Sequence, residues 1–336
     1  MSLWDSLKRW IVPARGSTPT QRLEVAPGLT VSLSRHEVDG PRGKWVCWSY
    51  VSEGLARHGQ KELVLLLRQG AAEAEPSSAA RSVLEFFVTV QDFAGRGMTV
   101  DAGGITRFGK HKLLGRHLLY VTPSELPGLP MPRDALAAVL VTDAECTLIE
   151  SAGPMRVMAS LGQAASHYPC PPWSDLARPE LPAAELWQAS QLSRMPLLKL
   201  PGVRVLQAEG EIILRIAPGT EALFRKLGGE HPVAAKGGFG LITGFDSTAD
   251  AWLVWEPGQS EPRAITPPGS RGTRVGGSFI ALFSEQEKDS SLLVEDGFTW
   301  FLTEASWTAL WRALNEGQSL ALLAGEGQRL RLEWVA

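Results

Sequence analysis

The sequence predicts an α+β protein of two packed halves, each with a mainly antiparallel or mixed sheet and covering helices. Three observations lead to this prediction. Short apolar runs of strand length recur along the whole chain of 336 residues, as expected for buried strands. Longer segments with apolar residues at helical spacing lie between them. A stretch with five prolines between residues 169 and 182 excludes regular structure and separates the two halves.

The first half is organised around residues 44–97. Contiguous apolar residues at 63–67 predict a strand covered on both faces, and the aromatic run at 45–51 predicts another central strand. A serine cap after a proline marks the start of a helix at about 78–94, which should end at one of the two following glycines. Five side chains at helical spacing should face the core: Val83, Phe86, Phe87, Val90 and Phe93.

Other elements of the first half follow from the same patterns. Alternating apolar residues predict a strand within 18–40, and Asp39-Gly40-Pro41 predicts the turn after it. A helix is expected at 154–161, with a proline in its first turn. Further strands are expected at 117–121, 135–141 and 146–149.

The second half starts with a short helix at 185–195. Two β-like runs follow within 198–216, split at Glu209-Gly210. Helices are expected at 221–227 and at 304–315, where apolar residues follow the i, i+3, i+4, i+7 pattern of a core-facing helix. The remaining elements should be strands, of which the last two form a closing hairpin: 241–245, 252–255, 279–283, 298–302, 319–323 and 330–335.

The proline-rich stretch separates two domains, and an N-terminal segment precedes the first of them. We expect an N-terminal segment at 1–18, an α/β domain at 19–180 and a β-rich α+β domain at 181–336. No internal repeat of fixed period is found in either half.

Charge, hydropathy and cysteine usage narrow the classes of function. The net charge of −3 argues against a nucleic-acid partner, which would favour a basic face. No apolar run approaches the ~18 residues of a membrane span, and the start of the chain lacks the features of a secretory signal peptide. Three cysteines far apart, Cys47, Cys146 and Cys170, do not form a disulfide framework. We therefore expect a reduced, cytoplasmic protein.

No motif has the spacing of a known catalytic, cofactor or metal centre. The segment 104–110 has the glycine and lysine spacing of a phosphate loop, but His111 stands where Ser or Thr should bind magnesium. Compact ligand clusters such as CxxC and HExxH do not occur. We therefore expect no cofactor and no metal. The alternative is an enzyme whose site is assembled from distant residues, such as Cys170 with His167 and Asp175.

Several stretches carry a family resemblance. WSYVSEGLARHGQKELVLLLR at 48–68, with the amphipathic helix after it, resembles the suppressor-of-fused-like domain. Other stretches resemble the C-terminal region of the Smad anchor for receptor activation and of endofin: HLLYVTP at 117–123, PMRVMASLGQAASHYPCPPWSDLARPE at 154–180, VGGSFIALFSEQEKDSSLLVEDGF at 275–298 and ALNEG at 313–317.

The resemblance implies a mixed α/β fold and a binding role, here in a bacterial homologue. Those eukaryotic scaffolds carry a lipid-binding zinc finger and a Smad-binding segment upstream of the shared region, and this chain has neither. We therefore expect neither endosomal targeting nor Smad binding. Bacterial suppressor-of-fused-like proteins also resemble immunity proteins for polymorphic toxins, which implies an immunity or secretion-linked adaptor role.

These observations lead us to expect a non-catalytic protein–protein interaction module whose partner is another, unidentified protein. A peptide-recognition surface of exposed sheet edges and tryptophans is a further hypothesis. The acidic pair Glu295-Asp296 is expected in a solvated turn between two strands, although an enzyme could use it as a carboxylate pair. The candidate functional surface comprises Trp48, Tyr168, Cys170, Trp173, Glu295 and Asp296.

Overall fold

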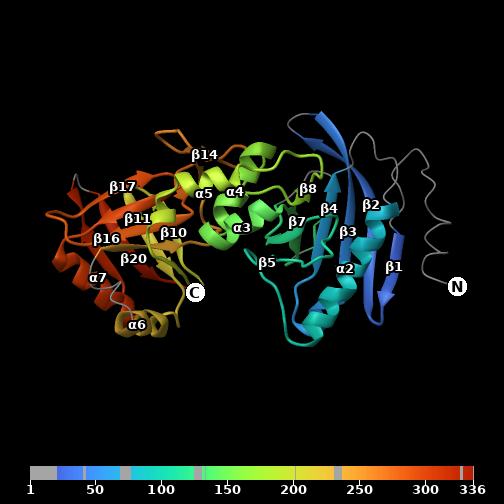
Figure 1. Cartoon of the computed structure of the whole chain (residues 1–336), viewed down its shortest axis with the longest axis horizontal. Coiled ribbons are helices and arrows are strands. Elements are labelled where there is room, and N and C mark those ends of the chain that lie inside the picture. Colours follow the sequence, from blue (N-terminus) through green and yellow to red (C-terminus); the bar gives the residue numbers. More distant parts are fainter. Residues whose placement is uncertain are drawn as a thin grey trace. The chain divides into compact units, whose positions relative to one another are not determined.

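A computed structural model describes the chain at residues 21–40, 43–68, 77–124, 131–132, 134–200, 202–230, 237–325 and 328–335. The described residues form helices together with mixed and antiparallel sheets, so the predicted α+β class is confirmed (Figure 1). The chain divides into two compact units, each made of two stretches. Unit 1 takes Met1–Cys146 and Pro171–Glu180, and unit 2 takes Thr147–Cys170 and Leu181–Ala336. The segment 1–18 lies outside the described residues.

Unit 1 is built on a sheet with strand order β1-β2-β3-β4-β7-β6-β5, and β8 also pairs with β4. Neighbouring strands are antiparallel, except that β4 runs parallel to β7 and β8. The strands are β1 (Gln21–Ala26), β2 (Leu29–Gly40), β3 (Gly43–Glu53), β4 (Leu63–Arg68), β5 (Ile105–Thr106), β6 (His117–Val121), β7 (Leu136–Val141) and β8 (Trp173–Ser174).

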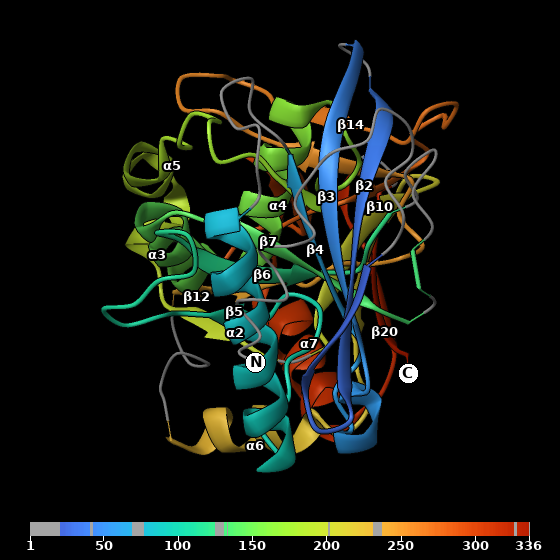
Figure 2. The same cartoon turned by 90° about the vertical axis from the view of Figure 1, so that its right-hand side faces the viewer.

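The central strand and the long helix of unit 1 agree with the sequence prediction. All five apolar residues at 63–67 are buried in β4. Helix α2 (Ser77–Gly95) lies against the sheet, as Figures 1 and 2 show, and buries Val83 and Phe87 completely. The predicted core position of Phe93 is wrong, since 44% of it is exposed. Ala94, the next residue, lies on the buried face of the helix instead, so Phe93 points away from the core.

The prediction of a strand at 146–149 is wrong, because this segment belongs to helix α3 (Asp143–Ala152). A reciprocal pair of hydrogen bonds starts the helix. The Glu145 N–H donates to Thr142 Oγ1 at 3.2 Å, and the Thr142 N–H donates to Glu145 Oε2 at 2.9 Å. This is a capping box, which satisfies two backbone donors that a helix start otherwise leaves unpaired. Helix α4 (Pro154–Ala165) follows and contains the predicted helix at 154–161.

The proline-rich segment returns to unit 1 and is held there by polar contacts. It forms the short strand β8, so the predicted lack of regular structure is wrong for two residues. The backbone N–H of Leu140 donates to Ser174 Oγ at 2.8 Å. Both terminal nitrogens of Arg178 donate to the carboxylate of Glu145 at 2.6 Å, and the Glu145 side chain is 0% exposed.

Unit 2 contains two sheets. One has the order β14-β13-β15-β10-β11-β20-β19 and the other β17-β18-β16-β12-β9. The first comprises β14 (Arg263–Ile265), β13 (Ala251–Val254), β15 (Arg274–Gly276), β10 (Arg204–Ala208), β11 (Glu211–Ile216), β20 (Arg329–Trp334) and β19 (Leu320–Leu323). The second comprises β17 (Ser290–Val294), β18 (Gly297–Phe301), β16 (Phe279–Phe283), β12 (Gly238–Ile242) and β9 (Leu197–Lys199).

The helices of unit 2 are short. Helix α5 (Ala183–Ala189) and the 3-10 turn η2 (Gln191–Arg194) occupy the segment expected as a short helix. Helix α6 (Glu221–Glu230) and helix α7 (Glu304–Glu316) confirm the other two helices, and Thr303 Oγ1 accepts the N–H of Ser306 as the predicted cap. None of the described helices has the length and apolar character needed to cross a membrane.

The two sheets of unit 2 and α7 contribute to a common apolar core. It combines residues from β10, β11, β12, β16, β18 and β20 with Trp307, Leu310 and Leu314 of the helix. The predicted closing hairpin is confirmed as β19 and β20. The sequence prediction missed the short strands β14 and β15, because each carries too few apolar residues at alternating positions to stand out.

Candidate functional site

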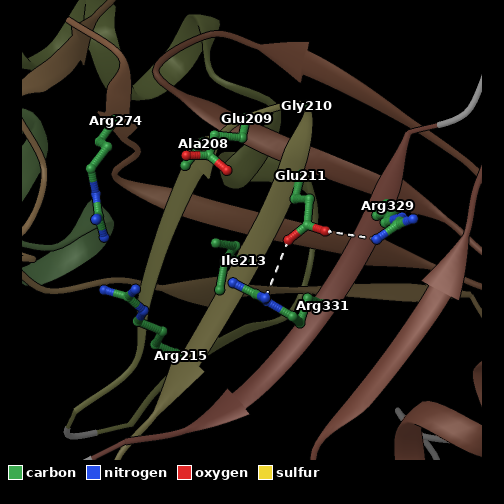
Figure 3. Close-up of a pocket in the computed structure, with 9 residues that line it drawn as sticks. All are labelled: Ala208, Glu209, Gly210, Glu211, Ile213, Arg215, Arg274, Arg329 and Arg331. Carbon is green, nitrogen blue, oxygen red and sulfur yellow. Dashed lines mark ion pairs between the residues drawn. The ribbon is translucent and has the colours of Figure 1, made fainter.

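A pocket of about 600 Å³ opens on the face of the larger sheet in unit 2 that points away from the core (Figure 3). Most of its lining is polar, with four guanidinium groups and two carboxylates around a small apolar floor. The lining residues are Ala208, Glu209, Gly210, Glu211, Ile213, Arg215, Arg274, Arg329 and Arg331.

Strand alternation explains why the arginines face outward. In β20 the sequence Arg-Leu-Arg-Leu places Leu330 and Leu332 in the core, each 1% exposed, and Arg329 and Arg331 on the opposite face. Strand β11 runs parallel to β20, with Glu211 opposite Arg329. Residues that are paired across strands share one face of a sheet, so the two strands together form one side of the pocket.

Two of the four pocket arginines are balanced by carboxylates. Arg215 donates to Asp246 Oδ2 at 3.0 Å and to Glu333 Oε2 at 3.2 Å. Arg331 Nε lies 3.0 Å from the other oxygen of Glu333, and its Nη1 lies 3.4 Å from Glu211. Burial alone would raise the pKa of Asp246. Hydrogen bonds from Thr248 and the charge of Arg215 outweigh burial, so the pKa of Asp246 is lowered.

The other two arginines keep open donor groups. Arg274 Nη2 donates to the Thr248 hydroxyl at 2.9 Å, while its Nε is buried without a hydrogen-bond partner, and no carboxylate of the described residues pairs with it. Arg329 makes one long contact, 3.5 Å to Glu211 Oε1, and its side chain is 64% exposed. Because a buried donor without an acceptor is costly, an anionic group bound at Arg274 would be favourable, and the exposed guanidinium of Arg329 suits a second one.

The turn between β10 and β11 lines the middle of the pocket. Glu209 has a φ of +51° and Gly210 a φ of +80°, the left-handed pair of a tight hairpin. Such a conformation favours Asn or Gly and costs a residue with a Cβ roughly 1 kcal/mol or more. The turn nevertheless carries an exposed glutamate at the pocket rim.

The predicted surface residues in unit 1 are packed rather than open. Trp173 in β8 is 9% exposed, and its ring centroid lies 5.0 Å from that of Trp45. Trp48 in β3 packs against the unit 1 core. None of the tryptophans in the described part of the chain is classed as exposed. The described residues therefore offer no cluster of open indole rings for a peptide-recognition surface.

The remaining predicted residues lie in unit 2. The hydroxyl of Tyr168 donates to the Ala249 carbonyl oxygen at 2.9 Å, and Cys170 is 2% exposed. The expectation that Glu295 and Asp296 face solvent is wrong, since their side chains are only 8% and 2% exposed. They occupy the predicted turn, here between β17 and β18, but the turn is covered. A partner-binding role for these residues stays a prediction.

Arg156 of α4 explains why two carboxylates are buried together. Its Nη2 donates to Glu295 Oε2 at 2.8 Å and its Nε to Asp296 at 3.1 Å. Burial would lower the pKa of the Arg156 guanidinium, but Asp296 and then Glu295 more than offset this effect and raise it. Glu295 also accepts the Ser190 hydroxyl and the Gln191 N–H, both at 2.6 Å. The network ties three distant segments of unit 2 together.

The residues of the enzymatic alternative belong to different units of the chain. His167 and Cys170 belong to unit 2, whereas Asp175 belongs to unit 1, where it pairs with Arg68 at 3.2 Å. Burial lowers the pKa of His167 to about 4, which makes it a weak general base at neutral pH. Across the described ranges, no three His, Cys, Asp or Glu side chains gather in a way that could hold a metal ion.

The buried imidazole of His167 predicts a loss of stability in mild acid. The unfolded histidine has a pKa of 6.5 against about 4 in the folded protein, so the unfolded state binds the proton more readily. Stability is then fully present above pH 6.5 and falls as the pH drops toward 4, by about 1–2 kcal/mol at pH 5. Urea denaturation at pH 7.5 and pH 5 should show this loss in the wild type and a smaller one in His167→Gln. Parallel losses in the two proteins would contradict the assignment to His167.

Sequence reasoning missed the arginine pocket, although part of its signal was visible. The alternation Arg329-Leu330-Arg331-Leu332 places two cations on one face of a strand. Arg274, in contrast, reaches the pocket only through the pairing of β15 with β10, which brings Ala208 opposite Arg274. No local pattern indicates that pairing.

Comparisons with known proteins add a distant likeness. No family model matches the chain, and no curated protein matches it. Among solved structures, the chain resembles Suppressor of Fused from Drosophila, with 12% sequence identity, a TM-score of 0.36, and coverage of 91% of this chain and 89% of that chain. The resemblance to the endofin region stays a prediction. At this level of similarity no residue role is transferred.

Proposed function

We propose that the chain is a non-catalytic protein-binding module, and that the arginine pocket of unit 2 binds an acidic segment of its partner. One observation supports this most strongly. Arg274, whose buried Nε lacks an acceptor, and the exposed Arg329 line the same pocket, on a sheet face that points away from the core. Guanidinium groups bind carboxylates through paired, charge-assisted hydrogen bonds. An acidic segment supplies the acceptors that the pocket lacks.

An apolar side chain beside the pocket favours a polypeptide over a small anion. Leu323 of β19 is paired with Arg329 of β20 and is 72% exposed. Paired residues lie on the same face of the sheet, so the leucine extends the pocket on the side of Arg329. A partner segment that combines acidic and apolar side chains matches both features.

We further propose a cytoplasmic location and a role as a bacterial immunity or secretion-linked adaptor protein. All three cysteines are buried and none of them forms a disulfide, which agrees with a reducing compartment. The adaptor or immunity role is supported by the sequence resemblance alone. Co-expression with a toxin encoded beside its gene should restore host growth if the chain neutralises that toxin. Continued growth arrest would contradict the immunity role.

Binding of a labelled acidic peptide tests the pocket directly. The full chain is titrated against fluorescein-labelled hexa-aspartate, and binding is followed by fluorescence anisotropy. The variant Arg274→Gln/Arg329→Gln should bind about tenfold or more weakly, because two charge-assisted contacts are lost. Added salt should weaken wild-type binding as well.

A matched control separates the pocket from net charge. Arg225→Gln/Lys226→Gln removes the same two charges from exposed positions of α6 and should change the affinity less than about twofold. If both double variants lower the affinity for hexa-aspartate equally, binding depends on overall charge and not on the pocket. Absence of binding to the wild type would overturn the proposed docking site.

A further inference from the structure

The two open arginines lie in a single row across the larger sheet of unit 2. Arg274 of β15 is opposite Ala208 of β10, Ala208 is opposite Glu211 of β11, and Glu211 is opposite Arg329 of β20. Three strand spacings separate the ends of this row. At about 4.8 Å each, the backbones that carry the two arginines are roughly 14 Å apart.

The middle of the row is small and acidic. Ala208 and Gly210 leave an open floor there, and the carboxylates of Glu209 and Glu211 lie between Arg274 on one side and Arg329 on the other (Figure 3). Glu211 is in contact with Arg329 and Arg331. Glu209 has no ion pair with any described residue. A third anion bound at the centre would therefore meet like charge.

We infer that the pocket recognises two anionic side chains about 14 Å apart with no anion between them. This inference rests on the proposed function and specifies the partner segment. An extended chain advances about 3.3–3.5 Å per residue, and its side chains alternate between two faces. Acidic residues at i and i+4 span the required distance and point to the same face. Spacings of i+3 and i+5 place the second acid on the wrong face, and i+2 is too short.

The spacing is tested by competition against labelled hexa-aspartate on the full-length chain. The competitors are capped peptides of equal length with two aspartates in an alanine–serine background, which differ only in the separation of the acids. The i, i+4 peptide should compete at least about threefold better than peptides with i, i+1 or i, i+3 acids. Equal competition at every separation would overturn the inference.

A charge in the centre gives a second, independent test. An aspartate added at i+2 raises the charge of the peptide and should nevertheless fail to improve its competition for the wild type. The same peptide should gain about twofold or more against Glu209→Gln, where the central repulsion is reduced. An improvement of equal size in both proteins would overturn the inference.

The proposed function and the inference fail in different ways. If the wild type does not bind hexa-aspartate, the docking site itself is wrong. If hexa-aspartate binds and the Arg274→Gln/Arg329→Gln variant loses it, but peptide spacing has no effect, the docking site stands and only the two-anion pattern is wrong.

Discussion

Replacing Arg156 with methionine should lower the free energy of unfolding by about 3–5 kcal/mol, because it leaves two buried carboxylates without their cation. Arg156 is 1% exposed and contacts both Glu295 and Asp296. Its guanidinium carbon also lies 5.7 Å from the ring centroid of Trp255 and 5.8 Å from that of Phe279. Methionine keeps the apolar stem and the packing against these rings. Urea denaturation followed by circular dichroism measures the loss.

A triple variant provides the matched control. Arg156→Met with Glu295→Gln and Asp296→Asn removes all three charges and keeps side chains of similar shape. It should recover most of the stability, since a buried ion network can be replaced by neutral groups at little cost. Glu295→Gln also retains a carbonyl oxygen that can accept from Ser190 and Gln191. No recovery in the triple variant would contradict an electrostatic origin.

Local sequence patterns predicted most of the secondary structure because its causes are local. Five contiguous apolar residues indicated β4, and the i, i+3, i+4, i+7 spacing indicated α7. The error at 146–149 has a local cause too. A short apolar run suits either a strand or a helix, and the capping box from Thr142 to Glu145 is the signal that decides between them. That signal lies directly before the run, outside the residues that suggested a strand.

The candidate site depends on contacts that no local pattern contains. Arg156 lies 139 residues from Glu295 in the sequence, so an acidic pair in a turn gave no sign of its buried cation. The tryptophans indicated a binding face only on the assumption that they are exposed, whereas Trp252 and Trp300 are 0% and 1% exposed. In the pocket, the register of β15 against β10 decides which arginine faces which strand.

A second large effect is expected at Gly54, where substitution by alanine should cost at least about 3 kcal/mol. Gly54 has a φ of +123°, and a Cβ added there would lie 2.1 Å from the carbonyl oxygen of Gly28. Backbone strain in this region costs about 1–3 kcal/mol, and overpacking adds a similar amount. The neighbouring backbone has little freedom to move, because the Gly54 N–H donates to Glu62 Oε1 at 2.8 Å and Glu62 Oε2 accepts the Ser52 hydroxyl at 2.6 Å.

Gly59, five residues on, separates the contribution of the close contact from that of the backbone conformation. Gly59 also has a positive φ, +75°, but no atom lies within 4 Å of an added Cβ. Gly59→Ala should therefore cost only about 1 kcal/mol. Urea denaturation of the two variants should differ by about 2 kcal/mol or more, and hydrogen exchange should locate the Gly54→Ala effect in β2, β3 and β4. Equal losses would mean that the close approach of Gly28 relaxes easily, and that the positive φ alone requires glycine in this connection.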